Sequence, residues 1–156
     1  MKTLGHILRC LFISPELLVM VAGVACLWWL PSTFENIAHR IATNGEMLRY
    51  LGLLAAALLT YDVKVAKSIL LPEDDDRNLL QKWDRFGDLK ICVWVGMIYA
   101  LLFAGLGLID SLFDWTKPTA FHAVALCVAI AGGIITSGTL ILAEIDLRIM
   151  LRKLSV

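Results

Sequence analysis

The fold of this chain is decided by residues 120–143, which read AFHAVALCVAIAGGIITSGTLILA. The stretch has no Asp, Glu, Lys or Arg, and its one histidine, His122, stands near its start. A helix rises about 1.5 Å per residue, so roughly 20 apolar residues cross the bilayer core of roughly 30 Å. The stretch therefore predicts a helix that spans a membrane.

Three more apolar runs precede this one, over residues 17–31, 47–61 and 91–109. The chain is 59% apolar with a formal net charge of zero, so its total charge points to no class of partner. The runs predict an all-α fold with four transmembrane helices, in one membrane domain that covers residues 1–156. We expect the spanning helices over residues 15–31, 46–71, 88–110 and 118–154.

The segments between the runs also show helical patterns. The second and fourth patterns continue to Pro72 and to about Leu154, which predicts cytoplasmic helical extensions of both spans. A cytoplasmic connector helix is expected over residues 73–87, and an amphipathic helix on the inner leaflet over residues 1–13. Apolar spacing between Phe34 and Ile41 predicts a short helix in the first outer loop.

The distribution of Lys and Arg predicts the orientation. Eleven of these bases lie before the first run, between the second and third runs and after the fourth, against three (Arg40, Arg49 and Lys117) in or beside the other two loops. Because bases accumulate on the cytoplasmic side of a membrane, both termini are expected in the cytoplasm. Trp28, Trp29 and Trp115 then fall at the opposite interface, which indole rings favour.

Small residues recur at every fourth position of the last two runs. They are Gly96, Ala100 and Ala104 in the third run and Ala125, Ala129 and Gly133 in the fourth. Such stripes let helix backbones approach closely in lipid. One interpretation is that they pack the helices of a single subunit. The other is that at least one stripe, on the fourth helix, faces a second copy of the chain.

Polar residues near the inner ends of the second and fourth helices are the candidates for a pore or gate. They are Asp62, Thr136, Ser137 and Glu144. For Asp62 the alternatives are a hydrated or paired acid at the interface and a residue that lines a cytoplasmic vestibule. For the fourth helix they are helix support, including an i,i+4 pair of Glu144 with Arg148, and a polar wall of a pore.

Bases on the two helical extensions are candidates for a cytoplasmic ligand site. They are Lys64, Lys67, Arg148, Arg152 and Lys153. Acids nearby make the local charge about neutral, so one interpretation is a solvated or lipid-facing surface. Alternatively, oligomerisation brings the bases together into a ring that binds an anion such as a nucleotide or oligonucleotide.

Catalytic motifs are absent from the sequence. It contains no Gly-rich phosphate loop, HExxH, GxSxG or dinucleotide-binding fingerprint. The four cysteines show no metal-binding spacing, and the three histidines lie in separate regions. We therefore expect no enzyme activity, no cofactor and no metal site.

Two functions fit these patterns. The first is a homo-oligomeric membrane channel or pore gated from its cytoplasmic face, because two unbroken helices link the membrane to the cytoplasm. The second is a non-conducting structural or accessory subunit that scaffolds a cytoplasmic partner protein. Ion flux through liposomes made with the purified protein distinguishes the two.

The overall layout resembles small four-span effectors of bacterial anti-phage defence, such as the channel subunit of the Hailong system. The resemblance covers a short first span, a long second helix that ends at Pro72, a charged connector over residues 73–90, and a fourth helix that runs to Arg152 and Lys153. It implies an oligomeric ion channel of a bacterial inner membrane, opened by a nucleotide-derived ligand at its cytoplasmic mouth.

Overall fold

The computed structural model describes residues 14–43, 45–72, 80, 83, 85–112 and 117–154. These residues form helices and connections without a strand, which confirms the predicted all-α fold. The predicted helix over residues 1–13, and the predicted connector helix over 73–87 apart from a few positions, lie outside the described residues. The helices are α2 (Pro15–Trp29), α3 (Pro31–Ala42), α4 (Gly45–Leu70), α6 (Phe86–Leu112) and α7 (Ala120–Leu154).

Local signals set the limits of the first two helices. The side chain of Ser14 accepts a hydrogen bond from the backbone N–H of Leu17 at 3.4 Å, and Pro15 occupies the first turn of α2. Pro31 begins α3, and the chain bends by 101° between the two helices. The short helix that the apolar spacing predicts in this region is therefore α3, which begins directly after the bend.

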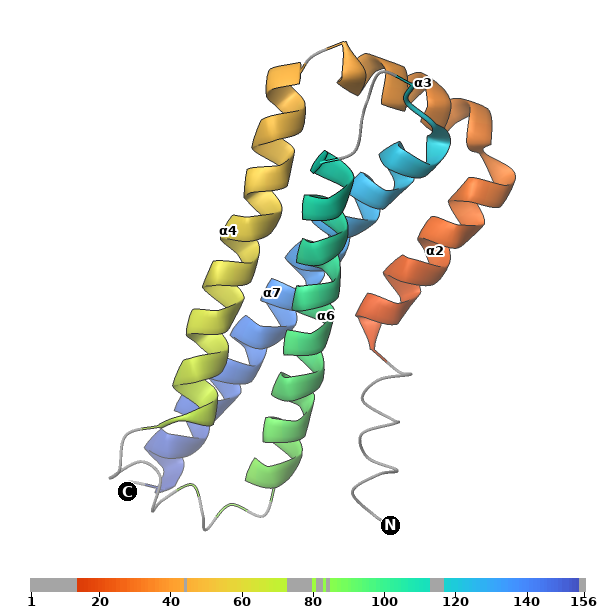
Figure 1. Cartoon of the computed structure of the whole chain (residues 1–156). Coiled ribbons are helices and arrows are strands. Elements are labelled where there is room, and N and C mark those ends of the chain that lie inside the picture. Colours follow the sequence, from red (N-terminus) through yellow and green to blue (C-terminus); the bar gives the residue numbers. More distant parts are fainter. Residues whose placement is uncertain are drawn as a thin grey trace.

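Helix α7 is the centre of the bundle, because α2, α3, α4 and α6 all pack against it. Helices α4 and α7 run in the same direction, whereas α2 and α6 run in the opposite direction (Figure 1). We call the end where α4 and α7 finish and α6 begins the tail end. The opposite end, where α3 lies across the bundle, is the bend end (Figure 1).

Within the described residues, two helices are long and apolar enough to span a membrane, over Phe86–Asp110 and Ala120–Lys153. The bent pair of α2 and α3 counts as a third if it is taken as one span. Helix α4 is less apolar, because its uncharged stretch between Arg49 and Asp62 holds 12 residues. That stretch covers only about 18 Å of a helix. Of the four predicted spans, the structure thus has two, or three with the bent pair.

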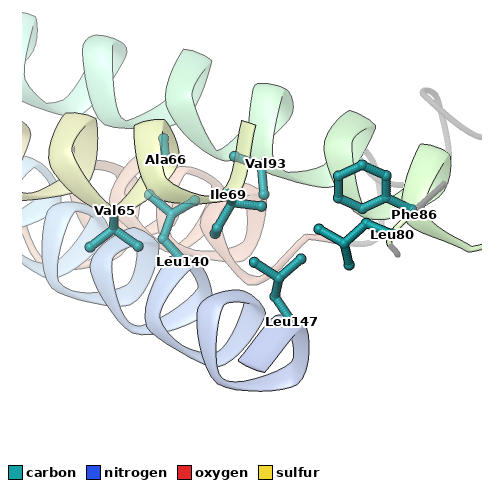
Figure 2. Packing of buried hydrophobic residues seen from close by; sticks show 8 residues of the cluster. All are labelled: Val65, Ala66, Ile69, Leu80, Phe86, Val93, Leu140 and Leu147. Atoms are coloured by element: carbon teal, nitrogen blue, oxygen red, sulfur yellow. The ribbon is translucent and has the colours of Figure 1, made fainter. Parts of the chain in front are cut away.

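The packed interior of the bundle is richest at the tail end. Eight buried apolar residues from α4, α6, α7 and the connection before α6 form one cluster, which we call the tail cluster (Figure 2). Its members are Val65, Ala66, Ile69, Leu80, Phe86, Val93, Leu140 and Leu147. Leu80, which precedes α6, and Phe86, the first residue of α6, share this cluster with residues of the three long helices.

The small-residue stripes are buried within the single chain. All six predicted packing positions have little exposed surface. On α6, Gly96 faces Leu140, and on α7, Gly133 faces Leu58 of α4. These two glycines therefore pack against helices of the same chain. The outer surface is instead formed by large apolar side chains, such as Leu101, Ile134 and Leu142.

Candidate functional site

A set of polar side chains, four of them buried and one (Thr139) half-buried, lies inside this apolar bundle, and we call it the polar layer. It consists of Glu16, Asp62, Thr136, Ser137 and Thr139. Asp62 is 1% exposed and Glu16 is 3% exposed. Isolated charges are costly to remove from water, so buried ionisable side chains in a membrane protein are functional candidates by default. The layer is the strongest such candidate in the described part of this chain.

Asp62 and Ser137 form one side of the layer, where α4 packs against α7. Each residue stands 17 positions after the start of its own helix, and the two helices run in parallel. One turn toward the bend end, Gly133 allows Leu58 to approach α7 closely. The Ser137 hydroxyl lies next to the Asp62 carboxyl, but neither Asp62 Oδ1 nor Ser137 Oγ has a hydrogen-bond partner among the described residues. Close packing therefore presses these two polar groups together inside the protein.

Glu16 and Thr139 form the other side, where α2 packs against α7. The Thr139 hydroxyl lies 3.0 Å from Glu16 Oε1 and 2.8 Å from the carbonyl oxygen of Thr136, and it donates its single proton to either acceptor. Glu16 also stands in the first turn of α2, where the helix dipole favours a negative charge. Because residues 137 and 139 are about 200° apart around a helix, the two carboxyl groups lie on different sides of α7.

Replacement of Thr139 by Val tests the second side. The variant keeps the shape of the side chain but removes the donor to the buried Glu16 carboxyl. We expect it to lower the free energy of unfolding by about 1–3 kcal/mol, measured by thermal unfolding in detergent. Thr60→Val is the matched control, because the Thr60 hydroxyl bonds only to the Ala56 carbonyl on an exposed face. Equal losses in both variants would show that the bond to Glu16 contributes nothing.

Apolar side chains close the polar layer on both sides within the chain. Toward the bend end, the ring of Phe103 packs directly against the backbone of Gly132 and stacks with Tyr99 at 6.1 Å between ring centroids. Toward the tail end, the tail cluster begins with Leu140 of α7 and Val65 of α4. A path for water or ions through one chain would therefore require these side chains to move.

The four predicted pore or gate residues do not lie together. Asp62, Thr136 and Ser137 belong to the polar layer. Thr136 donates to the carbonyl of Gly132 at 2.9 Å, so its hydroxyl is satisfied within its own helix. Glu144 lies outside the layer, where it forms the predicted pair with Arg148 at 2.7 Å. With its partner 72% exposed, this is a surface ion pair, which stabilises a helix by only about 0.3–0.5 kcal/mol.

The five predicted ligand-binding bases are spread over the tail end. Lys64 and Lys67 are exposed on α4. Arg148 lines an open pocket of about 440 Å³ together with Ser68, Pro72 and Glu144. Lys153 lines a different pocket of about 460 Å³, between α6 and α7, with Arg85, Asp88 and Asp146 among its other residues. Arg148 and Lys153 therefore line different pockets, and each of these two pockets contains acids as well as bases.

Sequence reasoning missed two of the buried acids. Glu16 follows a Ser-Pro helix start, where an acid is ordinarily hydrated, and only the packing of α2 against α7 buries it. Asp110 ends the third apolar run and is 3% exposed at the bend end, near His122. An acid that directly adjoins an uncharged run is the signal that could have indicated both.

Within the described residues, no group of three or more His, Cys, Asp or Glu side chains is arranged to hold a metal ion. Comparison of the chain with protein-family models, with curated proteins and with solved structures finds no match. The functional argument therefore depends on the polar layer and on the two helices that cross it.

Proposed function

We propose that this chain is the subunit of a homo-oligomeric membrane channel and that the polar layer forms part of its gate. The single observation that carries the proposal is the buried, unpartnered Asp62 Oδ1 beside Ser137 in a bundle with an apolar outer surface. Carboxylates and hydroxyls inside a membrane protein are the groups that replace the water around a permeating ion.

The membrane arrangement that we propose has four spans and cytoplasmic termini. Helices α2 and α4 join α6 and α7 as spans, and the tail end faces the cytoplasm, in agreement with the bias of Lys and Arg. A bilayer thinned around the protein accommodates the short uncharged stretch of α4 and the 15 residues of α2. We place the protein in a bacterial inner membrane, which is the location that the resemblance to defence effectors implies.

Gating follows from the continuity of α4 and α7. Both helices run without a break from the polar layer to the tail end, so a displacement of their ends moves Asp62 against Ser137. Because apolar side chains close the layer within one chain, the open path forms between copies or after α4 slides along α7. A ligand or partner that binds the tail end of the open state more tightly shifts the population toward it.

A nucleotide or oligonucleotide is the ligand class that we propose for the tail end. In one chain the bases of α4 and α7 are exposed and separate, whereas several copies around an axis would multiply them into a basic ring. We expect the fourfold variant Lys64→Glu, Lys67→Glu, Arg148→Glu and Arg152→Glu to lose its response to added nucleotide, with flux unchanged within about twofold on addition. The fourfold Gln variant is the control for charge reversal. A normal response in the Glu variant would contradict an anion site there.

The second candidate is a non-conducting structural subunit that holds a cytoplasmic partner protein. The observation that favours it is the apolar closure of the polar layer by Phe103 and by the tail cluster. A membrane anchor needs no internal path, and its tail end would serve only as a docking surface.

Ion flux from liposomes that contain the purified protein separates the two functions. The channel proposal predicts release of potassium from loaded vesicles in proportion to the amount of protein, and a smaller release from vesicles made with Asp62→Asn. Vesicles without flux under every nucleotide and voltage tested, together with co-purification of a stable partner protein, would support the scaffold instead.

A further inference from the structure

The buried carboxyl of Asp62 has no basic partner among the residues that the structure describes. The ion pair found in this part of α4 and α7 joins Arg148 to Glu144, and the nearby bases Lys64 and Lys67 point to the exposed surface. Asp62 Oδ1 also accepts no hydrogen bond. A buried carboxyl group in a protein is either protonated or, when ionised, paired with a positive charge, and the ion pair in this part of the described residues does not involve Asp62.

Ser137 differs from the other hydroxyl residues in the described parts of α4 and α7. Thr60, Ser68, Thr136 and Thr139 each donate to a backbone carbonyl three or four residues earlier. That bond is the usual way in which a Ser or Thr hydroxyl is satisfied inside a helix. The Ser137 hydroxyl makes no such bond, although the residue is only 6% exposed, and it lies beside Asp62 instead.

We infer that Asp62 and Ser137 bind a monovalent alkali cation between α4 and α7. Asp62 Oδ1 and Ser137 Oγ are both hard oxygen ligands, and neither has a hydrogen-bond partner among the described residues. One carboxylate balances one positive charge. A divalent cation would need a second carboxylate for charge balance, and Glu16 lies on a different side of α7. The chemistry of the site therefore favours sodium, potassium or lithium over a divalent cation.

The cation would also tie the two parallel helices together at the depth where the proposed gate lies. This inference rests on the same Asp62 and Ser137 pair as the proposed function and names the ligand that the pair binds. If the protein binds the cation but conducts no ions, the cation site is supported and only the channel proposal fails.

Thermal unfolding of the purified protein in detergent measures the binding. Sodium, lithium or potassium chloride is titrated from about 1 to about 100 mM, with choline chloride added to hold the ionic strength constant. A ligand that binds only the folded state raises the midpoint, and we expect a saturating rise of about 3 °C or more with at least one of these cations. Asp62→Asn is expected to lose this rise.

Ser137→Ala is a second test if Asp62→Asn does not fold. We expect the cation concentration that gives half of the rise in the unfolding midpoint to increase at least about tenfold in this variant. Asp110→Asn is the matched control, because it removes another buried carboxyl far from the site, and it should keep the full response. No response of the wild-type protein to any alkali cation would overturn the inference. An undiminished response in Asp62→Asn or in Ser137→Ala would overturn it as well.

Discussion

Gly132→Ala is expected to lower the free energy of unfolding by about 1–3 kcal/mol, although alanine favours a helix more than glycine does. A Cβ atom at this position would overlap the aromatic ring of Phe103, which is 2% exposed and has little room to retreat. The substitution therefore forces α6 and α7 apart where they close the polar layer. Chemical or thermal unfolding in detergent measures the loss.

Gly138→Ala is the matched control on the same helix. A Cβ atom there meets nothing within 4 Å, so the substitution is expected to raise stability by about 0.5–1 kcal/mol through helix propensity alone. Opposite signs for these two glycines would support the packing of α6 against α7. In the Gly132→Ala background, Phe103→Leu should restore part of the loss. A neutral Gly132→Ala variant would contradict the contact.

The double variant Asp62→Leu with Ser137→Ala is expected to separate stability from function. It replaces two buried polar groups by apolar ones, and such exchanges are neutral or stabilising by about 1–4 kcal/mol when both partners change together. If these residues belong to the gate, the same variant should lose ion flux by about tenfold or more. Stability is measured by unfolding in choline chloride, and flux in liposomes.

Thr60→Val serves as the control for this pair, because it removes a hydroxyl of α4 that bonds only to its own helix. It should leave flux unchanged. Two results would contradict a functional role for the pair: full flux in the double variant, or a large loss of stability that accounts for the lost flux.

The positions of the helices could be predicted from the sequence. The uncharged run of α7 and the Ser-Pro start of α2 predict helices near the observed ones, because length and capping are properties of a single segment. The apolar character of α4 was overstated. Its charges at Arg49, Asp62 and Lys64 leave an uncharged stretch that is too short to span the core of a bilayer by itself.

The candidate site was predictable only in part, because it is built between helices. The sequence places Asp62 off the face of Lys64 and Lys67, but it does not show that this acid meets Ser137 on a parallel helix. The bond from Thr139 to Glu16 joins residues 123 positions apart, and no pattern within either helix implies it. Only Glu144 with Arg148, an i,i+4 pair, followed from spacing alone.

Single-channel recording from purified protein in a planar bilayer tests the central claim most directly. With a gradient of potassium chloride across the bilayer, the account predicts discrete current steps that reverse close to the equilibrium potential of potassium. These steps are expected to be lost in Asp62→Asn. A membrane that stays electrically silent with the folded protein inserted, at every voltage and with every nucleotide added, would contradict the account.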